Sequence, residues 1–154
     1  MFSKKTILQL CIAMVLMVAA CLPVSAQGLT LQGSWLVSIT LDGTPGPFAI
    51  DIAVFDNQGS YRIIPSTKAE SEGTGAYQRL GGLEFRSTHT QVLYDAQGNF
   101  AGIAKVIATE TLTNGGETFT GRFRVDILDA TGTVIPGAGF TGSVSGRRVV
   151  PQPL

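Results

Sequence analysis

Apolar and polar residues alternate one by one over several segments of the chain, whereas no window after the first 26 residues has helical spacing. The clearest segment surrounds Phe119, Phe123 and Val125, which alternate with threonine, arginine and aspartate. Because successive side chains of a strand point to opposite faces, this period of two predicts half-buried β-strands. The predicted strands cover residues 32–41, 48–55, 60–64, 75–79, 83–94, 99–113, 117–128 and 138–149.

Turn signals separate these segments. An apolar-Asp-x-x-Gly-x-apolar pattern occurs three times, at 55–61, 94–100 and 128–134. The aspartate can cap a tight turn with its side chain, and the glycine can take the left-handed conformation that the next strand needs. Asn114-Gly115 and the segment 42–47 are further turn signals. Consecutive strands are therefore expected to form antiparallel hairpins.

The fold class expected from this meander is all-β, an antiparallel up-and-down barrel of about eight strands, because closure removes both sheet edges. A two-sheet β-sandwich is the alternative. The glycine content and the small residues Ala101, Gly102 and Ala104 in a long strand favour the barrel. The least patterned segment is 65–74, for which we expect a solvated loop; a lid over one end is the alternative.

The first 26 residues have the three parts of a signal peptide. Lys4 and Lys5 precede an apolar run over 7–22, and small residues end at Ala26 after a helix-breaking Pro23. The run is shorter than the about 20 apolar residues that span a bilayer. We therefore expect cleavage after Ala26 and a periplasmic or secreted protein.

An alternative for this leader is lipidation. Residues 18–21 resemble the bacterial lipobox, in which Cys21 would become the lipidated first residue and would anchor the protein in the cell envelope. Under the favoured interpretation 1–26 is the signal peptide, 27–150 the barrel domain and 151–154 a short tail. Both cysteines of the chain lie in the leader, so the mature domain forms no disulfide.

Charge excludes one class of partner. The chain has 11 basic and 11 acidic residues, and removal of the two leader lysines leaves a net charge of −2. The remaining basic residues are dispersed, with only Arg122/Arg124 and Arg147/Arg148 close together. Nucleic-acid binding needs clustered lysine and arginine, so nucleic acid is not an expected partner. Membrane contact is expected only through a lipid on Cys21.

Gly33-Ser34-Trp35 at the first strand and Arg148 at the last resemble the calycin superfamily, which includes lipocalins, fatty-acid-binding proteins and avidins. The resemblance implies that Trp35 covers the floor of a barrel and that Arg148 lies over its indole ring. The chain lacks the disulfide and the helix after the barrel that lipocalins often carry. It is also similar to allene-oxide-cyclase and dirigent-like barrels in length and in its glycine-rich hairpins.

Glu110 is the first candidate for chemistry. It shares a strand face with Phe100 and Leu112, so it is a buried carboxylate if that face is the interior. Burial would raise its pKa and suit it to act as an acid or base. The structural alternatives are an ion pair with Arg86 or Arg124, or a position that reaches water.

His89, the single histidine, is the second candidate. The favoured interpretation is a partly exposed strand residue, and the alternative is an inward proton-transfer group or a polar contact for a ligand. No metal site is expected, because zinc needs three or four ligands. Residues 137–142 match Gly-x-Gly-x-x-Gly but precede a strand rather than a helix, so no cofactor is expected.

The aromatic-rich strands and the lack of a convincing catalytic set favour an exported barrel that binds a small apolar molecule. The alternatives are a cofactor-free cyclase or isomerase and a structural envelope domain with a filled core, and the sequence does not decide whether the protein is an enzyme. Neither ligand identity nor oligomeric state is predicted. The expected ligand-binding residues are Phe85, His89, Glu110, Phe119 and Phe123.

Overall fold

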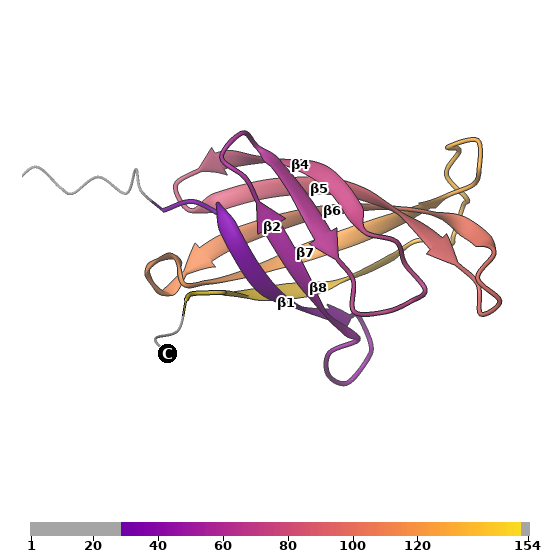
Figure 1. Cartoon of the computed structure of the whole chain (residues 1–154), viewed down its shortest axis with the longest axis horizontal. Helices are drawn as coiled ribbons and strands as arrows, with labels where there is room; N and C mark the ends of the chain where they lie inside the picture. The colour runs from indigo at the N-terminus through magenta and orange to yellow at the C-terminus, as the bar shows by residue number, and fades with distance from the viewer. Residues whose placement is uncertain (1–28, 152–154) are drawn as a thin grey trace, which may run out of the picture.

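The computed structural model describes residues 29–151, which form one closed antiparallel barrel (Figure 1). Each strand pairs with the next along the chain, and β8 pairs with β1 to close the sheet. The predicted up-and-down barrel is confirmed, and the sandwich alternative is wrong. The strands are β1 (Gly33–Leu41), β2 (Ala49–Phe55), β3 (Ser60–Ile64), β4 (Gly73–Gly81), β5 (Glu84–Tyr94), β6 (Phe100–Thr113), β7 (Thr118–Leu128) and β8 (Phe140–Arg148).

The strand boundaries follow the alternation of the sequence closely. The largest difference is at β4, which extends from Gly73 to Gly81 rather than over 75–79. Within residues 29–151, no helix is long and apolar enough to cross a membrane. The predicted leader, with its cleavage site at Ala26 and the alternative lipidation site at Cys21, lies outside the described residues.

The three repeated aspartate turns share one hydrogen-bond pattern. Oδ1 of Asp56 accepts the backbone N–H groups of Gln58 and Ser60, both at 2.8 Å. Asp95 and Asp129 accept the equivalent pair of bonds in the β5–β6 and β7–β8 connections. The glycine three positions later has φ between 82° and 88° in each case, a conformation that favours glycine. The recurring motif therefore specifies three local turns.

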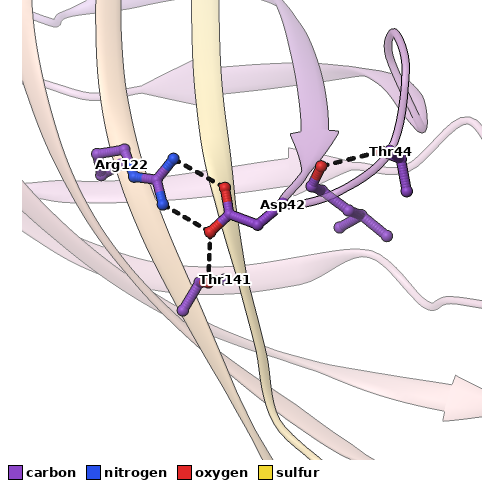
Figure 2. Close-up of polar contacts among 5 residues, drawn as sticks. Asp42, Thr44, Arg122 and Thr141 are labelled. Atoms are coloured by element: carbon purple, nitrogen blue, oxygen red, sulfur yellow. Dashed lines mark hydrogen bonds and ion pairs between the residues drawn. The ribbon is translucent and has the colours of Figure 1, made fainter.

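A fourth aspartate ties the β1–β2 turn to the strands beside it (Figure 2). Arg122 of β7 donates two hydrogen bonds to the Asp42 carboxylate, at 2.9 and 2.6 Å, and Thr141 of β8 donates a third at 2.5 Å. These bonds lower the pKa of Asp42, with Arg122 the largest cause. The cluster lies on the solvent side and fixes the turn where β1 leaves the barrel.

The start of β6 contains a bulge that the sequence pattern did not indicate. The pairing with β5 shifts between Leu93 and Tyr94, and Gly102 has φ of 152°, which few residues other than glycine adopt. Phe100 is consequently 49% exposed. The expectation that Phe100 shares the inward face of Glu110 is therefore wrong, because the extra residue reverses the alternation before Gly102.

One end of the barrel is closed by a packed core around Trp35. Leu31, Trp35 and Leu112 are fully buried there, and the Trp35 and Phe119 rings pack with their centroids 5.0 Å apart. Trp35 Nε1 donates a 2.6 Å hydrogen bond to the carbonyl of Leu31. The segment before β1 therefore crosses the barrel end and covers the tryptophan.

Arg148 completes this closed end in the way the family resemblance implies. Its guanidinium carbon lies 4.3 Å from the centroid of the Trp35 ring. The same guanidinium donates to the carbonyls of Thr30, Gln32 and Gly116. Gly33 has φ of 119°, and a Cβ there would lie 2.9 Å from Arg148 Nη1. The glycine of Gly-x-Trp is thus required by both its backbone conformation and the arginine beside it.

Candidate functional site

The interior of the barrel beyond this core holds a cavity of about 260 Å³. It opens toward the end at which β1, β3, β5 and β7 terminate, where the β5–β6 and β7–β8 hairpins project in Figure 1. Ligand sites usually occupy about 300–1,000 Å³, so the volume of this cavity lies just below the usual range. The side chains of the barrel therefore leave part of the interior unfilled.

The cavity has an apolar wall and a polar wall. The apolar wall comes from β7, β8 and β1, with Phe123, Val125 and Val144 among its members. The polar wall comes from β2, β3, β5, the inner end of β6 and the β3–β4 connection. Its polar side chains are Asp51, Tyr61, Glu70, Ser87, His89, Gln91 and Glu110. Because β2 to β6 are consecutive around the barrel, these groups gather on one half of the interior.

Glycines of β4 explain how the polar side chains meet. Gly75 pairs with Tyr61 of β3 on one side and with His89 of β5 on the other. A Cβ at Gly75 would lie 2.7 Å from the Cβ of His89, so a larger residue would push against the histidine. With no side chain between them, the Tyr61 hydroxyl lies 2.5 Å from His89 Nδ1.

The tyrosine–histidine pair is neutral at physiological pH. Burial lowers the pKa of His89 to about 4 and raises that of Tyr61. The Tyr61 hydroxyl therefore donates its proton to Nδ1, and the histidine carries its own proton on Nε2. His89 is only 9% exposed, so the expectation of a partly exposed residue is wrong. The missing side chain at Gly75 leaves room for the ring inside the barrel.

Glu110 lies deeper in the cavity and is only partly satisfied. Its Oε1 accepts a 2.5 Å hydrogen bond from the Ser87 hydroxyl, whereas its Oε2 is buried and has no hydrogen-bond partner among the described residues. Burial raises the pKa of the carboxyl to about 7, against a smaller lowering effect of Ser87. Glu110 is 4% exposed. At neutral pH both the acid and the carboxylate forms of this group are therefore populated.

Neither arginine considered as a partner reaches Glu110. Arg86 is exposed, and Arg124 extends outward to Asp126 at 3.4 Å. Both arginines occupy outward-facing positions of their strands, because they alternate with the residues that face the barrel interior. The ion-pair alternative is therefore wrong, and Ser87 on the neighbouring strand is the hydrogen-bond partner instead.

The β3–β4 connection brings another carboxyl group to the mouth of the cavity. Asp51 Oδ1 accepts the backbone N–H of Ser66 at 2.9 Å, and Ser71 exchanges hydrogen bonds with the backbone of Val92 on β5. Glu70, next to Ser71, lines the cavity. Burial raises the pKa of Asp51, and burial with the nearby Asp51 charge raises that of Glu70. The connection is thus attached to two strands rather than simply solvated.

The structure brings together four of the five expected ligand-binding residues. His89, Glu110, Phe119 and Phe123 all line the cavity. Phe85 does not, because it packs into the closed-end core with the Arg79 guanidinium 4.9 Å from its ring centroid. The expectation for Phe85 is therefore wrong, because its side chain faces inward but packs among the residues of the closed-end core.

Five polar members of the site were not identified from the sequence. Parity could have found some of them, since Ser87 and Gln91 share the strand face of His89, and Asp51 shares the face of Ala49 and Phe55. Glu70 lies in a segment without periodicity and gave no signal. Tyr61 is the apolar residue that ends the 55–61 turn pattern, and this pattern gave no sign of a polar contact.

The fold and the site define a closed eight-stranded antiparallel barrel with a two-walled internal cavity. No protein-family model matches the chain, and neither a curated protein nor a solved structure is significantly similar to it. Across residues 29–151, no three histidine, cysteine, aspartate or glutamate side chains are grouped in a way that could hold a metal ion.

Proposed function

We propose that this protein binds a small, largely apolar molecule inside the barrel. The observation that carries the proposal is the cavity of about 260 Å³, open at one end and lined by an apolar wall opposite a few convergent polar groups. Concave sites of this composition are the usual form of small-molecule sites. The volume favours a compact molecule over a long-chain lipid.

A cavity-filling variant tests this proposal. Ala108 lines the cavity between Ser87 and Phe123, whereas Ala76 of β4 faces solvent. Isothermal titration calorimetry with indole, benzyl alcohol and cyclohexanol should detect binding to the wild type. Ala108→Leu should weaken that binding at least about tenfold, and Ala76→Leu should leave it unchanged. Circular dichroism checks that both variants fold.

The proposal fails if none of the three compounds binds to the wild type. It also fails if a folded Ala108→Leu variant binds them as well as the wild type does, because the ligand would then lie elsewhere on the molecule.

We infer further that the barrel belongs to the calycin superfamily. The support is the closed end, where Gly33, Trp35 and Arg148 combine in an eight-stranded antiparallel barrel as the resemblance implies. Membership of the calycin superfamily would agree with the proposed binding function, since the families named for this resemblance include ligand-binding barrels.

The proposed site of action is outside the cytoplasm, and its support is the signal-peptide pattern of residues 1–26. The intact mass of the protein purified from its native host tests it. A mature N-terminus at Gln27 is the expected result, and an acylated Cys21 would indicate a lipid-anchored form. Recovery of the chain with Met1 in place would contradict export.

A cofactor-free cyclase or isomerase is the second candidate, and the Glu110 carboxyl with its pKa of about 7 favours it. Glu110→Gln and His89→Ala distinguish the two functions. If both variants keep their affinity for a ligand while turnover of that ligand collapses, the protein is an enzyme. If the wild type converts none of its ligands, this candidate is wrong.

A further inference from the structure

We propose that the ligand of this cavity is a small apolar amine, whose cationic nitrogen binds the Glu110 carboxylate at the inner end of the polar wall. This inference rests on the proposed binding function and narrows it to one chemical class. It concerns which molecules the cavity accepts, not whether it binds any.

The charge of the cavity lining is the first argument. Three carboxyl side chains line it, those of Asp51, Glu70 and Glu110, whereas none of the described lining residues is a lysine or an arginine. A fatty acid or another carboxylate would meet like charges and find no cationic partner. A ligand with a positive charge has the complementary sign.

The unpartnered oxygen of Glu110 also favours a cationic ligand. Oε2 is buried and receives no hydrogen bond in the described part of the chain, while Oε1 is occupied by Ser87. Buried polar atoms in proteins nearly always have a partner, because an unsatisfied one costs about 1–3 kcal/mol. An ammonium group can supply the missing donor in a charge-assisted hydrogen bond, which is stronger than a neutral one.

The geometry of β6 defines the orientation of such a ligand. From the mouth inward, its lining residues are Ala104, Val106, Ala108 and then Glu110, and Leu112 already belongs to the closed-end core. The small side chains between the mouth and Glu110 leave space beside the apolar wall. The amine therefore enters nitrogen first, and its apolar body packs against β7, β8 and β1.

None of the other titratable groups that line the cavity supplies a positive charge to Glu110. On the same half of the interior as Glu110 are Tyr61 of β3 and His89 of β5, both neutral, with Asp51 and Glu70 nearer the mouth. Among the described residues of β7, β8 and β1, none that lines the cavity is titratable. Glu110 consequently has no internal cation, and a bound amine would favour its ionised form.

Three compounds with one benzyl or phenyl body test the charge preference: benzylamine, benzyl alcohol and benzoate. Isothermal titration calorimetry at pH 8 should show that benzylamine binds more tightly than benzyl alcohol and at least about tenfold more tightly than benzoate. Between pH 8 and pH 6 the benzylamine affinity should fall about tenfold, because Glu110 becomes protonated while the amine stays cationic. The affinity of benzyl alcohol should change much less.

Glu110→Gln is the decisive variant, and Glu117→Gln is its matched control, since Glu117 is an exposed residue next to the β6–β7 turn. Glu110→Gln should remove the preference for benzylamine and its pH dependence, whereas Glu117→Gln should keep both. Unfolding by urea checks that each variant is folded.

The outcomes separate this inference from the proposed function. If benzyl alcohol binds inside the cavity but benzoate binds as tightly as benzylamine, or if Glu110→Gln keeps the amine preference, the protein is a binding barrel and the amine proposal is wrong. If none of these three compounds binds to the wild type, and neither indole nor cyclohexanol does, both proposals are wrong.

Discussion

Glu110 and His89 are buried ionisable groups on neighbouring strands, and burial acts on them in opposite directions. The pKa of Glu110 is raised to about 7 from 4.5, so its contribution to stability is complete below pH 4.5 and is lost as the pH rises through 7. The pKa of His89 is lowered to about 4 from 6.5, so its contribution is present above pH 6.5 and is lost as the pH falls through 4. The two windows overlap, and the wild type should show a weak net pH dependence between them.

Glu110→Gln should uncover this compensation. Glutamine cannot ionise and can still accept the hydrogen bond from Ser87, so the variant should gain stability over the wild type as the pH rises from 4.5 to 7. The gain should approach about 3 kcal/mol at pH 8, from the size of the pKa shift. Urea unfolding at pH 5 and pH 8 measures the difference. A difference that is the same at both pH values would show that Glu110 titrates normally.

Tyr61→Phe tests the hydrogen bond between the tyrosine and the histidine. The change leaves Nδ1 of a buried imidazole without its donor, so the free energy of unfolding at pH 7 should fall by about 1–3 kcal/mol. Tyr94→Phe is the control, because Tyr94 lies at the far end of β5 and does not contact this pair. Equal effects of the two substitutions would argue against a specific Tyr61–His89 bond.

At the scale of elements, β4 is a spacer that allows β3 and β5 to share the interior. Gly73 and Gly75 take inward positions that alternation would give to side chains, and His89 and Gln91 occupy the space beside Gly73. The polar wall therefore depends on two residues that have no functional groups of their own. The residues of the polar wall come from distant parts of the chain, as Tyr61 and His89 are 28 positions apart.

Gly75→Ala should disturb this arrangement. Its Cβ would press on His89 and on the backbone of Thr88, which should cost about 1–3 kcal/mol of stability and weaken ligand binding. Gly81→Ala is the matched control on the same strand, because a Cβ there meets nothing within 4 Å in the described structure. Thermal unfolding and calorimetry measure both effects. Equal tolerance of the two alanines would contradict a spacer role for Gly75.

The closed end makes a separate prediction about the last strand. Lysine at position 148 would keep the charge but could not hold three carbonyls and cover the indole with one planar group. Arg148→Lys should therefore lower the free energy of unfolding by about 1–3 kcal/mol. Arg147→Lys, at the exposed neighbouring position, should have little effect. Urea unfolding compares them, and similar losses would mean that Arg148 is not specifically required.

The elements were predictable from the sequence because their causes are local. Alternation specifies the strands, and each aspartate turn is made within five residues, as at Asp56. Phe100 was misplaced because a bulge interrupts alternation without changing composition. Phe85 was misplaced for another reason: parity predicts which face a residue takes, but not its height in the barrel. The partners of Glu110 and His89 depend on the register between strands, which the turns and bulges set together.

At the scale of the whole molecule, barrel closure joins a sealed end to an open one. The Trp35 core closes the end at which β1 starts, and the cavity occupies the other end with its polar groups on the β2–β6 half. An up-and-down order makes this asymmetry simple to build, since strands consecutive in the sequence are also neighbours in space. Under the proposed function, one half of the sheet would orient the ligand and the other half would desolvate it.

The most direct test of this account is a crystal structure of the protein with benzylamine at pH 8. The ring should lie against Ala108 and Phe123, with the nitrogen about 3 Å from Glu110 Oε2. An interior filled by its own side chains, or a ligand whose nitrogen points to the mouth and leaves Glu110 without a partner, would contradict it.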